Sequence, residues 1–241
     1  MSELGFAGKT AALVRKDLLV ESRGRDTLPP MLAFAFTVAL VLAFSLPGSS
    51  ELRSPVRLPA GTVMVADVLA GFLWITVLFS GLVGFARTFE VEREEGSIDS
   101  LLLAPLDRSG LFASKAAANL LFVGAVELFL LPVFGLLFGV DLARSWPLLV
   151  LVTVLADIGF VAIGTLFASL AAQTRSRELL LVILALPALV PLFIAAVELT
   201  SDLFLGAGLE VVAARGWFAI LVAFDIVFTV VGALAFEFVI D

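Results

Sequence analysis

Three acidic side chains lie inside long apolar runs of the sequence, where an ionised group is expensive. They are Glu127, Asp157 and Asp225, and no Lys or Arg lies in the same runs to neutralise them. Carboxyl groups at membrane depth must be compensated, and they often mark functional sites. Two interpretations stay open. The acids either hydrogen-bond to neighbouring helices for structural reasons, or they serve conduction or conformational switching, for instance as a proton relay.

The chain lacks the side chains that most metal and haem chemistry needs. It has no His, no Cys and no Tyr, and its Met residues are Met1, Met31 and Met64. Haem iron takes His, Met, Cys or Tyr as protein ligands, and zinc takes Cys, His or carboxylates. A single Met near the end of an apolar run is better explained by packing. We therefore expect no haem ligand, no metal site and no cofactor bound by this chain.

A phosphate-binding loop is also missing. ATP-driven pumps use the pattern GxxxxGK[ST], whose glycine-rich backbone cradles the phosphates. The nearest string here is Gly8-Lys9-Thr10, but Glu3 stands where the first glycine should be. The chain is therefore predicted not to be an enzyme, and any ATP hydrolysis would belong to a separate subunit.

The composition identifies the medium in which these residues must work. Hydrophobic residues make up 61% of the chain, and its mean hydropathy is +1.14. A water-soluble surface cannot be built from such a chain, whereas lipid accepts an apolar exterior. The formal net charge of −7 makes nucleic acid an unexpected partner.

Six apolar runs are long enough to cross a bilayer, which takes roughly 20 helical residues each. The runs do not alternate as barrel strands would. The sequence predicts an all-α integral membrane protein, with residues 1–241 forming a single six-helix domain. The predicted spans are residues 28–49, 66–86, 116–140, 146–171, 179–199 and 216–238.

The distribution of basic residues predicts the orientation of the spans. Eleven of the fifteen Lys and Arg residues fall on the side that holds both termini and the loop over residues 87–115. The positive-inside rule therefore places both termini and this loop in the cytoplasm. Residues 11–21 read as an amphipathic helix on the cytoplasmic membrane surface, either as a basic anchor or as an interaction element.

The loop over residues 87–115 is the densest block of charge, with ten of the 37 charged residues. Within it, Ser97 can cap a short helix whose first turn holds Asp99 and which Pro105 ends. Ile98, Leu101 and Leu102 fall on one apolar face of that helix. A helix this short needs a surface to pack on. The alternatives are a connector with an interfacial helix or a docking helix for a cytosolic protein. The candidate docking residues are Glu94, Glu95, Gly96, Ser97, Ile98, Asp99, Leu101, Leu102 and Pro105.

These motifs resemble a known transporter family. The segment EEGSIDSLLLAPL at residues 94–106 is similar to the coupling-helix region of ABC-2-type export permeases. With GFLW at 71–74, RKDLLVESR at 15–23 and RSRELLLVILALPALVPLFIAA at 175–196, the chain resembles more narrowly the B subunits of the bacterial cytochrome c maturation, or haem exporter, ABC system. After about Val197 the likeness is one of hydropathy alone.

The resemblance implies a function and partners. It implies a multi-pass permease subunit of the bacterial inner membrane, which couples a cytosolic ABC ATPase, in two copies, to a haem-handling membrane subunit and a haem chaperone. Six spans imply a homodimer or a heteromeric membrane complex. The movement driven by ATP binding and hydrolysis in the ATPase would either export haem or release a haem-loaded chaperone. The alternatives are a generic ABC-2 exporter of a lipid, drug or glycan, and an ion-coupled secondary transporter that uses the three intramembrane acids.

Overall fold

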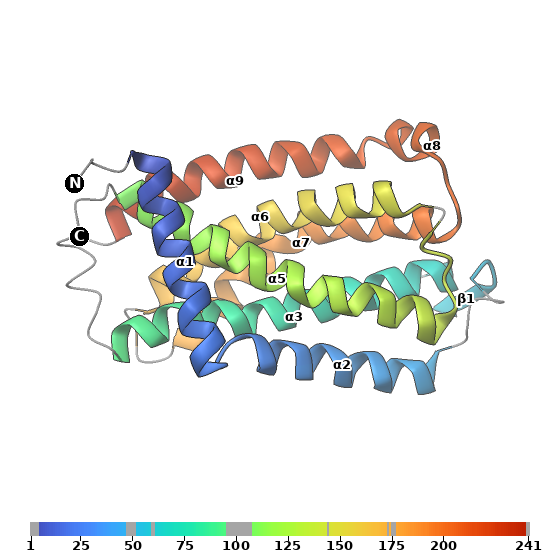
Figure 1. Cartoon of the computed structure of the whole chain (residues 1–241). Helices are drawn as coiled ribbons and strands as arrows, with labels where there is room; N and C mark the ends of the chain where they lie inside the picture. The colour runs from blue at the N-terminus through green and yellow to red at the C-terminus, as the bar shows by residue number, and fades with distance from the viewer. Residues whose placement is uncertain are drawn as a thin grey trace.

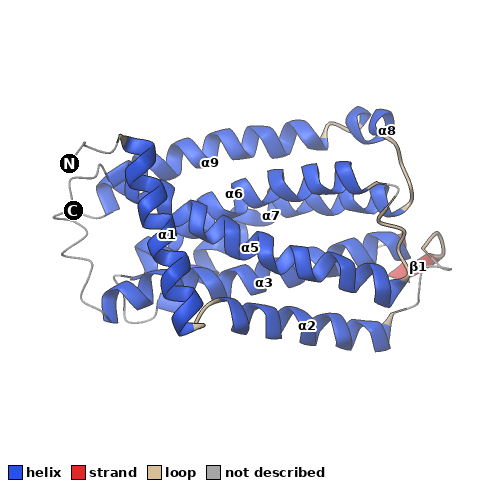
Figure 2. Cartoon of the chain, in the orientation of Figure 1, coloured by secondary structure: helices blue, strands red, loops and turns tan. Residues whose placement is uncertain are grey.

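The computed structural model describes residues 5–46, 52–58, 61–94, 108–143, 145–172, 174 and 177–239. These residues are almost entirely helical, as Figure 2 shows. Among these described residues, six helices are long and apolar enough to span a membrane, which confirms the predicted number. They are α2 (Leu28–Ser45), α3 (Val65–Glu94), α5 (Arg108–Phe138), α6 (Trp146–Ala172), α7 (Arg177–Phe204) and α9 (Trp217–Val239).

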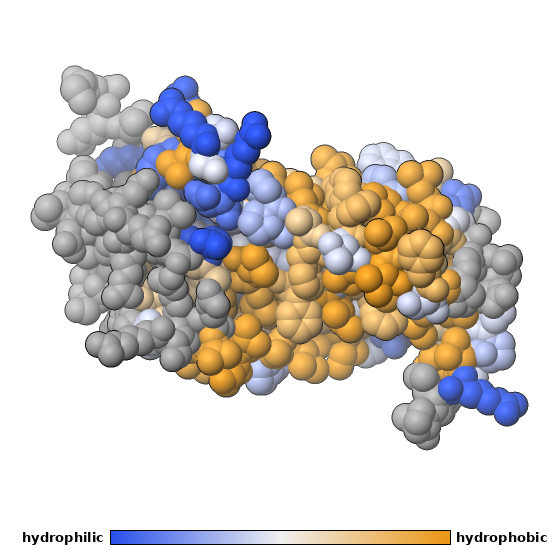
Figure 3. All heavy atoms as spheres, turned by 90° about the horizontal axis from the view of Figure 1, so that it is seen from below, coloured by the Kyte–Doolittle hydropathy of each residue, from blue (hydrophilic) through white to orange (hydrophobic). Residues whose placement is uncertain are grey.

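The six helices run side by side along one axis, and a further helix, α1 (Phe6–Gly24), lies across them (Figure 1). The start of α1, the end of α3, the start of α5 and the end of α9 gather at one end, which we call the loop end. The opposite end, here the hairpin end, carries the short helix α8 (Leu209–Ala214) and two strands. On the face that Figure 3 shows, mostly hydrophobic side chains cover the surface between the two ends, which we call the hydrophobic belt.

Helix α6 forms the centre of the bundle and packs against α3, α5, α7 and α9. Small residues allow this close packing, since a Cβ on Gly164 would overlap the ring of Phe85 on α3. Phe160 of α6 contacts Phe85 and Phe193 edge to face, with ring centroids 4.9 and 5.2 Å apart. Aromatic pairs in this geometry stabilise a fold beyond the burial of their apolar area. The core therefore ties α3, α6 and α7 together.

A small antiparallel hairpin, absent from the sequence prediction, lies at the hairpin end. Its strands β1 (Pro55–Leu58) and β2 (Gly61–Met64) pair in the register Pro55 to Met64. Met64 thus lies in a strand before α3, and not inside a span. Asp67 follows in the first turn of α3, where it accepts hydrogen bonds from the Met64 backbone N–H and the Ser201 hydroxyl of α7. Two four-residue strands are too short to leave a clear alternating pattern in the sequence.

The predicted loop over residues 87–115 must be corrected at both ends. Helix α3 continues to Glu94, and α5 begins at Arg108. Glu and Arg are good helix formers, so a membrane helix can continue into water through charged sequence. Residues 95–107, which include the predicted docking helix, lie outside the described residues.

Candidate functional site

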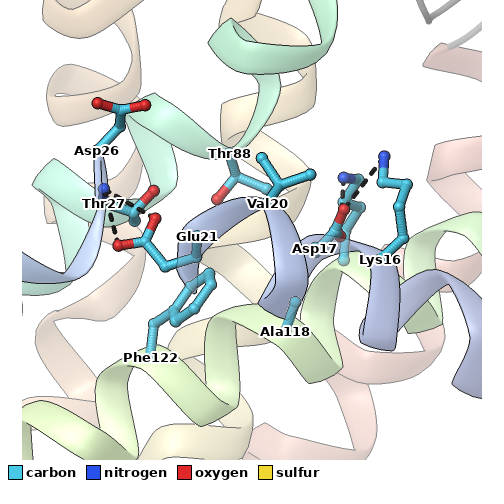
Figure 4. A pocket seen from close by; sticks show the side chains of 10 residues that line it. Lys16, Asp17, Val20, Glu21, Asp26, Thr27, Thr88, Ala118 and Phe122 are labelled. Carbon is cyan, nitrogen blue, oxygen red and sulfur yellow. Dashed lines mark hydrogen bonds and ion pairs between the residues drawn. The ribbon is translucent and has the colours of Figure 1, made fainter. Parts of the chain in front are cut away.

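Helices α1, α3 and α5 form a junction at the loop end. A small pocket marks it, with walls from these three helices and from the start of α2 (Figure 4). Helices α3 and α5 lead directly into and out of residues 95–107. The covalent connection between that segment and the bundle therefore runs through these two helices.

A buried ion pair fastens α1 to α5. Lys115 Nζ donates to Asp17 Oδ2 at 2.9 Å, and the side chains are only 3% and 12% exposed. Lys16 Nζ lies 3.2 Å from the other oxygen of the same carboxylate, so Asp17 is shared between two amines (Figure 4). Removing one member of such a pair takes from the other its closest opposite charge, which is costly for a buried group. The pair therefore fixes the position of α1 on the bundle.

Glu21, one helical turn after Asp17, caps the first membrane helix. Its carboxylate accepts hydrogen bonds from the backbone N–H groups of Thr27, at 3.0 and 3.2 Å, and Leu28, at 2.7 Å. The N–H groups at the start of a helix have no partner within the helix, and a carboxylate there also interacts favourably with the positive end of the helix dipole. Arg25, in the left-handed conformation at φ 59°, ends α1 and turns the chain toward α2.

A series of hydrogen-bonded polar side chains crosses the bundle beside this junction. The Thr88 hydroxyl of α3 lies 2.6 Å from Asn119 Oδ1 of α5, and Asn119 Nδ2 donates to Thr165 Oγ1 of α6 at 3.0 Å. Asn119 and Thr165 are fully buried. Polar bonds between helices in a low-dielectric interior hold a defined register. These three side chains therefore connect both helices that flank the predicted docking segment to the central helix α6.

The three intramembrane acids are all buried, but the structure brings only two of them together. The carboxyl groups of Glu127 on α5 and Asp157 on α6 are buried and lie within interaction distance of each other. A hydrogen bond between them requires a proton on one of the two groups, because an ionised carboxylate can only accept. The second oxygen of each, Glu127 Oε1 and Asp157 Oδ1, has no hydrogen-bond partner among the described residues.

Asp225 of α9 stands apart from this pair. Its carboxyl lies against Gly159 of α6, where a Cβ would come within 2.6 Å of Oδ1. Neither of its oxygens meets a hydrogen-bond partner in the described part of the chain. Across the same residues, no three acidic side chains are grouped closely enough to hold a metal ion. The three acids are therefore one carboxyl pair and one separate group.

Of the nine predicted docking residues, the structure describes only the backbone of Glu94, in the last turn of α3. The other eight, Glu95, Gly96, Ser97, Ile98, Asp99, Leu101, Leu102 and Pro105, fall outside the described residues.

Comparison with known proteins identifies the family. The family model described as "CcmB protein" matches residues 9–241 of this chain. The chain belongs to the CcmB family. Curated relatives carry the name "Heme exporter protein B". The one from Paracoccus denitrificans is 31% identical over 78% of this chain and 80% of its own length. The one from Bradyrhizobium diazoefficiens is 28% identical over 93% of this chain and 94% of its own length.

Sequence reasoning missed the anchoring residues of this CcmB-family chain. Asp17 and Glu21 were seen only as polar positions of an amphipathic helix, and Asn119 as part of an apolar run. One signal was present, because Asp17 and Glu21 are four residues apart and so share a helical face. Nothing in the sequence paired that face with Lys115, which is 98 residues away from Asp17.

Proposed function

We propose that this chain is the membrane permease subunit of an ABC-type haem exporter that serves cytochrome c biogenesis in a bacterial inner membrane. The match of the CcmB family model to residues 9–241 carries the proposal. The relatives named "Heme exporter protein B" are of similar length, and six membrane-spanning helices suit a permease.

The energy would come from a partner, since the sequence has no phosphate-binding loop. A cytosolic ABC ATPase, in two copies, would bind residues 94–105 through the face formed by Ile98, Leu101 and Leu102. The excess of Lys and Arg supports a cytoplasmic loop end. A second membrane subunit, or a second copy of this chain, would complete the transmembrane assembly.

The junction of α1, α3 and α5 suggests how a stroke at residues 94–105 would spread. The ends of α3 and α5 would move with the docked ATPase. Thr88, Asn119 and Thr165 would pass the movement to α6, which packs on four other spanning helices. The Asp17–Lys115 pair would carry α1 along with α5. The chain would act as a mechanical coupler.

Haem itself would be held elsewhere in the assembly. The sequence offers no His, Cys or Tyr as an axial ligand. A haem-handling membrane subunit and a haem chaperone would supply those ligands. The stroke of this chain would then either move haem or release the loaded chaperone.

Genetic complementation tests the proposal. The host is a bacterium that lacks its own B subunit but keeps the other maturation subunits, and the proposal predicts that it makes no holo-cytochrome c. Expression of this chain together with its cognate ATPase should restore covalently attached haem, measured by haem staining of membrane proteins. Failure to restore it, with the chain present in the membrane at normal levels, would contradict the proposed function.

A further inference from the structure

The outward face of α1 carries basic and apolar side chains in a single stripe. Ala12, Arg15, Leu19 and Arg23 follow one another at helical spacing and line an open groove, together with Lys16 and Val20. Leu19 is 46% exposed, and Leu18 beside it is 37% exposed. Both arginines are exposed as well. Such a face suits neither pure water nor pure hydrocarbon.

The acidic residues of α1 that pair are turned to the other side. Asp17 binds Lys115, and Glu21 caps α2. No carboxylate of the described residues pairs with Arg15 or Arg23. The protein as a whole has a formal net charge of −7, yet Arg15 and Arg23 give this face positive charge that no carboxylate of the described residues neutralises.

The placement of α1 indicates what it meets. The helix lies across the bundle axis, along the outside of the spanning helices and near their loop end (Figure 1). Hydrophilic side chains project there at the border of the hydrophobic belt (Figure 3). In a bilayer matched to this belt, the headgroup layer would begin at that border. Long basic side chains extend into that layer while their stems and neighbouring leucines contact acyl chains.

We propose that the Arg15–Arg23 face of α1 is a binding site for anionic phospholipid. Guanidinium groups match phosphate oxygens in geometry and charge. The apolar Leu18 and Leu19 favour the lipid over free phosphate, which has no acyl chain to offer them. The site would hold α1 in the membrane plane while Asp17 and Glu21 hold it on the bundle. The inference does not depend on the cargo of the exporter.

The test compares two matched pairs of substitutions in the full-length chain. R15Q/R23Q removes two arginines from the α1 face, and R53Q/R57Q removes two exposed arginines from the hairpin end. Each protein is reconstituted into nanodiscs of phosphatidylcholine with an equimolar share of phosphatidylglycerol. Lipid retained after transfer into detergent is counted by native mass spectrometry. Hydrogen–deuterium exchange of residues 6–24 is followed in discs with and without phosphatidylglycerol.

Wild type and R53Q/R57Q should retain phosphatidylglycerol preferentially and show slower exchange in α1 when it is present. R15Q/R23Q should lose the preference about tenfold, because each basic residue at an anionic surface contributes favourably. R15K/R23K should retain most of it, which separates lost charge from a damaged fold. Equal preference in R15Q/R23Q and R53Q/R57Q would overturn the proposal. So would α1 protection that follows added cytosolic ATPase and ignores phosphatidylglycerol, since a protein would then cover this face.

Discussion

Individual charged residues in this chain are accommodated by partners on other helices. Lys115, almost fully buried on α5, is matched by Asp17 of α1. The acids at membrane depth have weaker compensation. Glu127 and Asp157 interact with each other, and Asp225 lies against Gly159. The difference matters for mutation, because a pair of opposite charges and a pair of carboxyl groups that share a proton respond differently when one member is removed.

The ion pair predicts non-additive effects on stability. D17L or K115L alone should destabilise the protein, by at most about 3–5 kcal/mol, since each takes from a largely buried charge its closest opposite charge. The double variant D17L/K115L should recover much of that loss, because it removes both of these charges. Thermal unfolding in detergent of the four proteins measures the coupling. Additive losses in the double variant would show that the two residues do not act as a pair.

The pairing of Glu127 with Asp157 predicts that the protein's stability tolerates an amide at position 127 but not a leucine. E127Q keeps a donor for Asp157, so its stability should stay near that of the wild type. E127L leaves the buried carboxyl of Asp157 without a partner and should cost about 1–3 kcal/mol more than E127Q. The comparison is made by thermal unfolding in one detergent. Equal stability of E127Q and E127L would mean that the hydrogen bond contributes nothing.

At the scale of elements, helix positions could be predicted from hydropathy, whereas their exact ends and contacts could not. All six spans were expected, because each must cover the same hydrocarbon thickness. The continuation of α3 to Glu94 and the start of α5 at Arg108 were not, since charged residues allow a helix and a loop equally well. The hairpin was missed because its strands are only four residues long.

Close packing of α3 on α6 depends on glycine. In G164A the new methyl group would overlap the Phe85 ring, and overpacking of a core costs about 1–3 kcal/mol. G124A on α5 is the matched control, because a Cβ there meets nothing within 4 Å. Unfolding midpoints in detergent should fall for G164A and stay level or rise for G124A. A loss of the same size in both would argue against close packing at Gly164.

The docking of α1 shows the limit of sequence reasoning most clearly. An amphipathic helix was expected over residues 11–21, and the structure has a helix at Phe6–Gly24. Its attachment through Asp17 and Glu21 is a tertiary property, and the sequence carries no sign of which distant residue completes each bond. The predicted docking residues beyond Glu94 lie outside the described part of the chain, so their role stays a proposal.

At the scale of the whole molecule, the chain is expected to transmit movement between its partners and not to bind haem. With no His, Cys or Tyr in the sequence, the purified subunit incubated with haem should show no Soret band above that of a membrane protein of unrelated function. The absorbance spectrum after removal of free haem is the measurement. A stoichiometric band would mean that this subunit binds the cargo directly.

Residues 94–105 are proposed to bind a separate ATPase, and co-purification tests this binding most directly. The tagged chain, extracted in mild detergent from cells with the cognate subunits, should bring down an ABC ATPase identified by mass spectrometry. L101D/L102D should lose that ATPase. L209D/V211D, which alters two exposed apolar residues of α8 at the hairpin end, should keep it. Undiminished recovery of the ATPase with L101D/L102D would contradict the account.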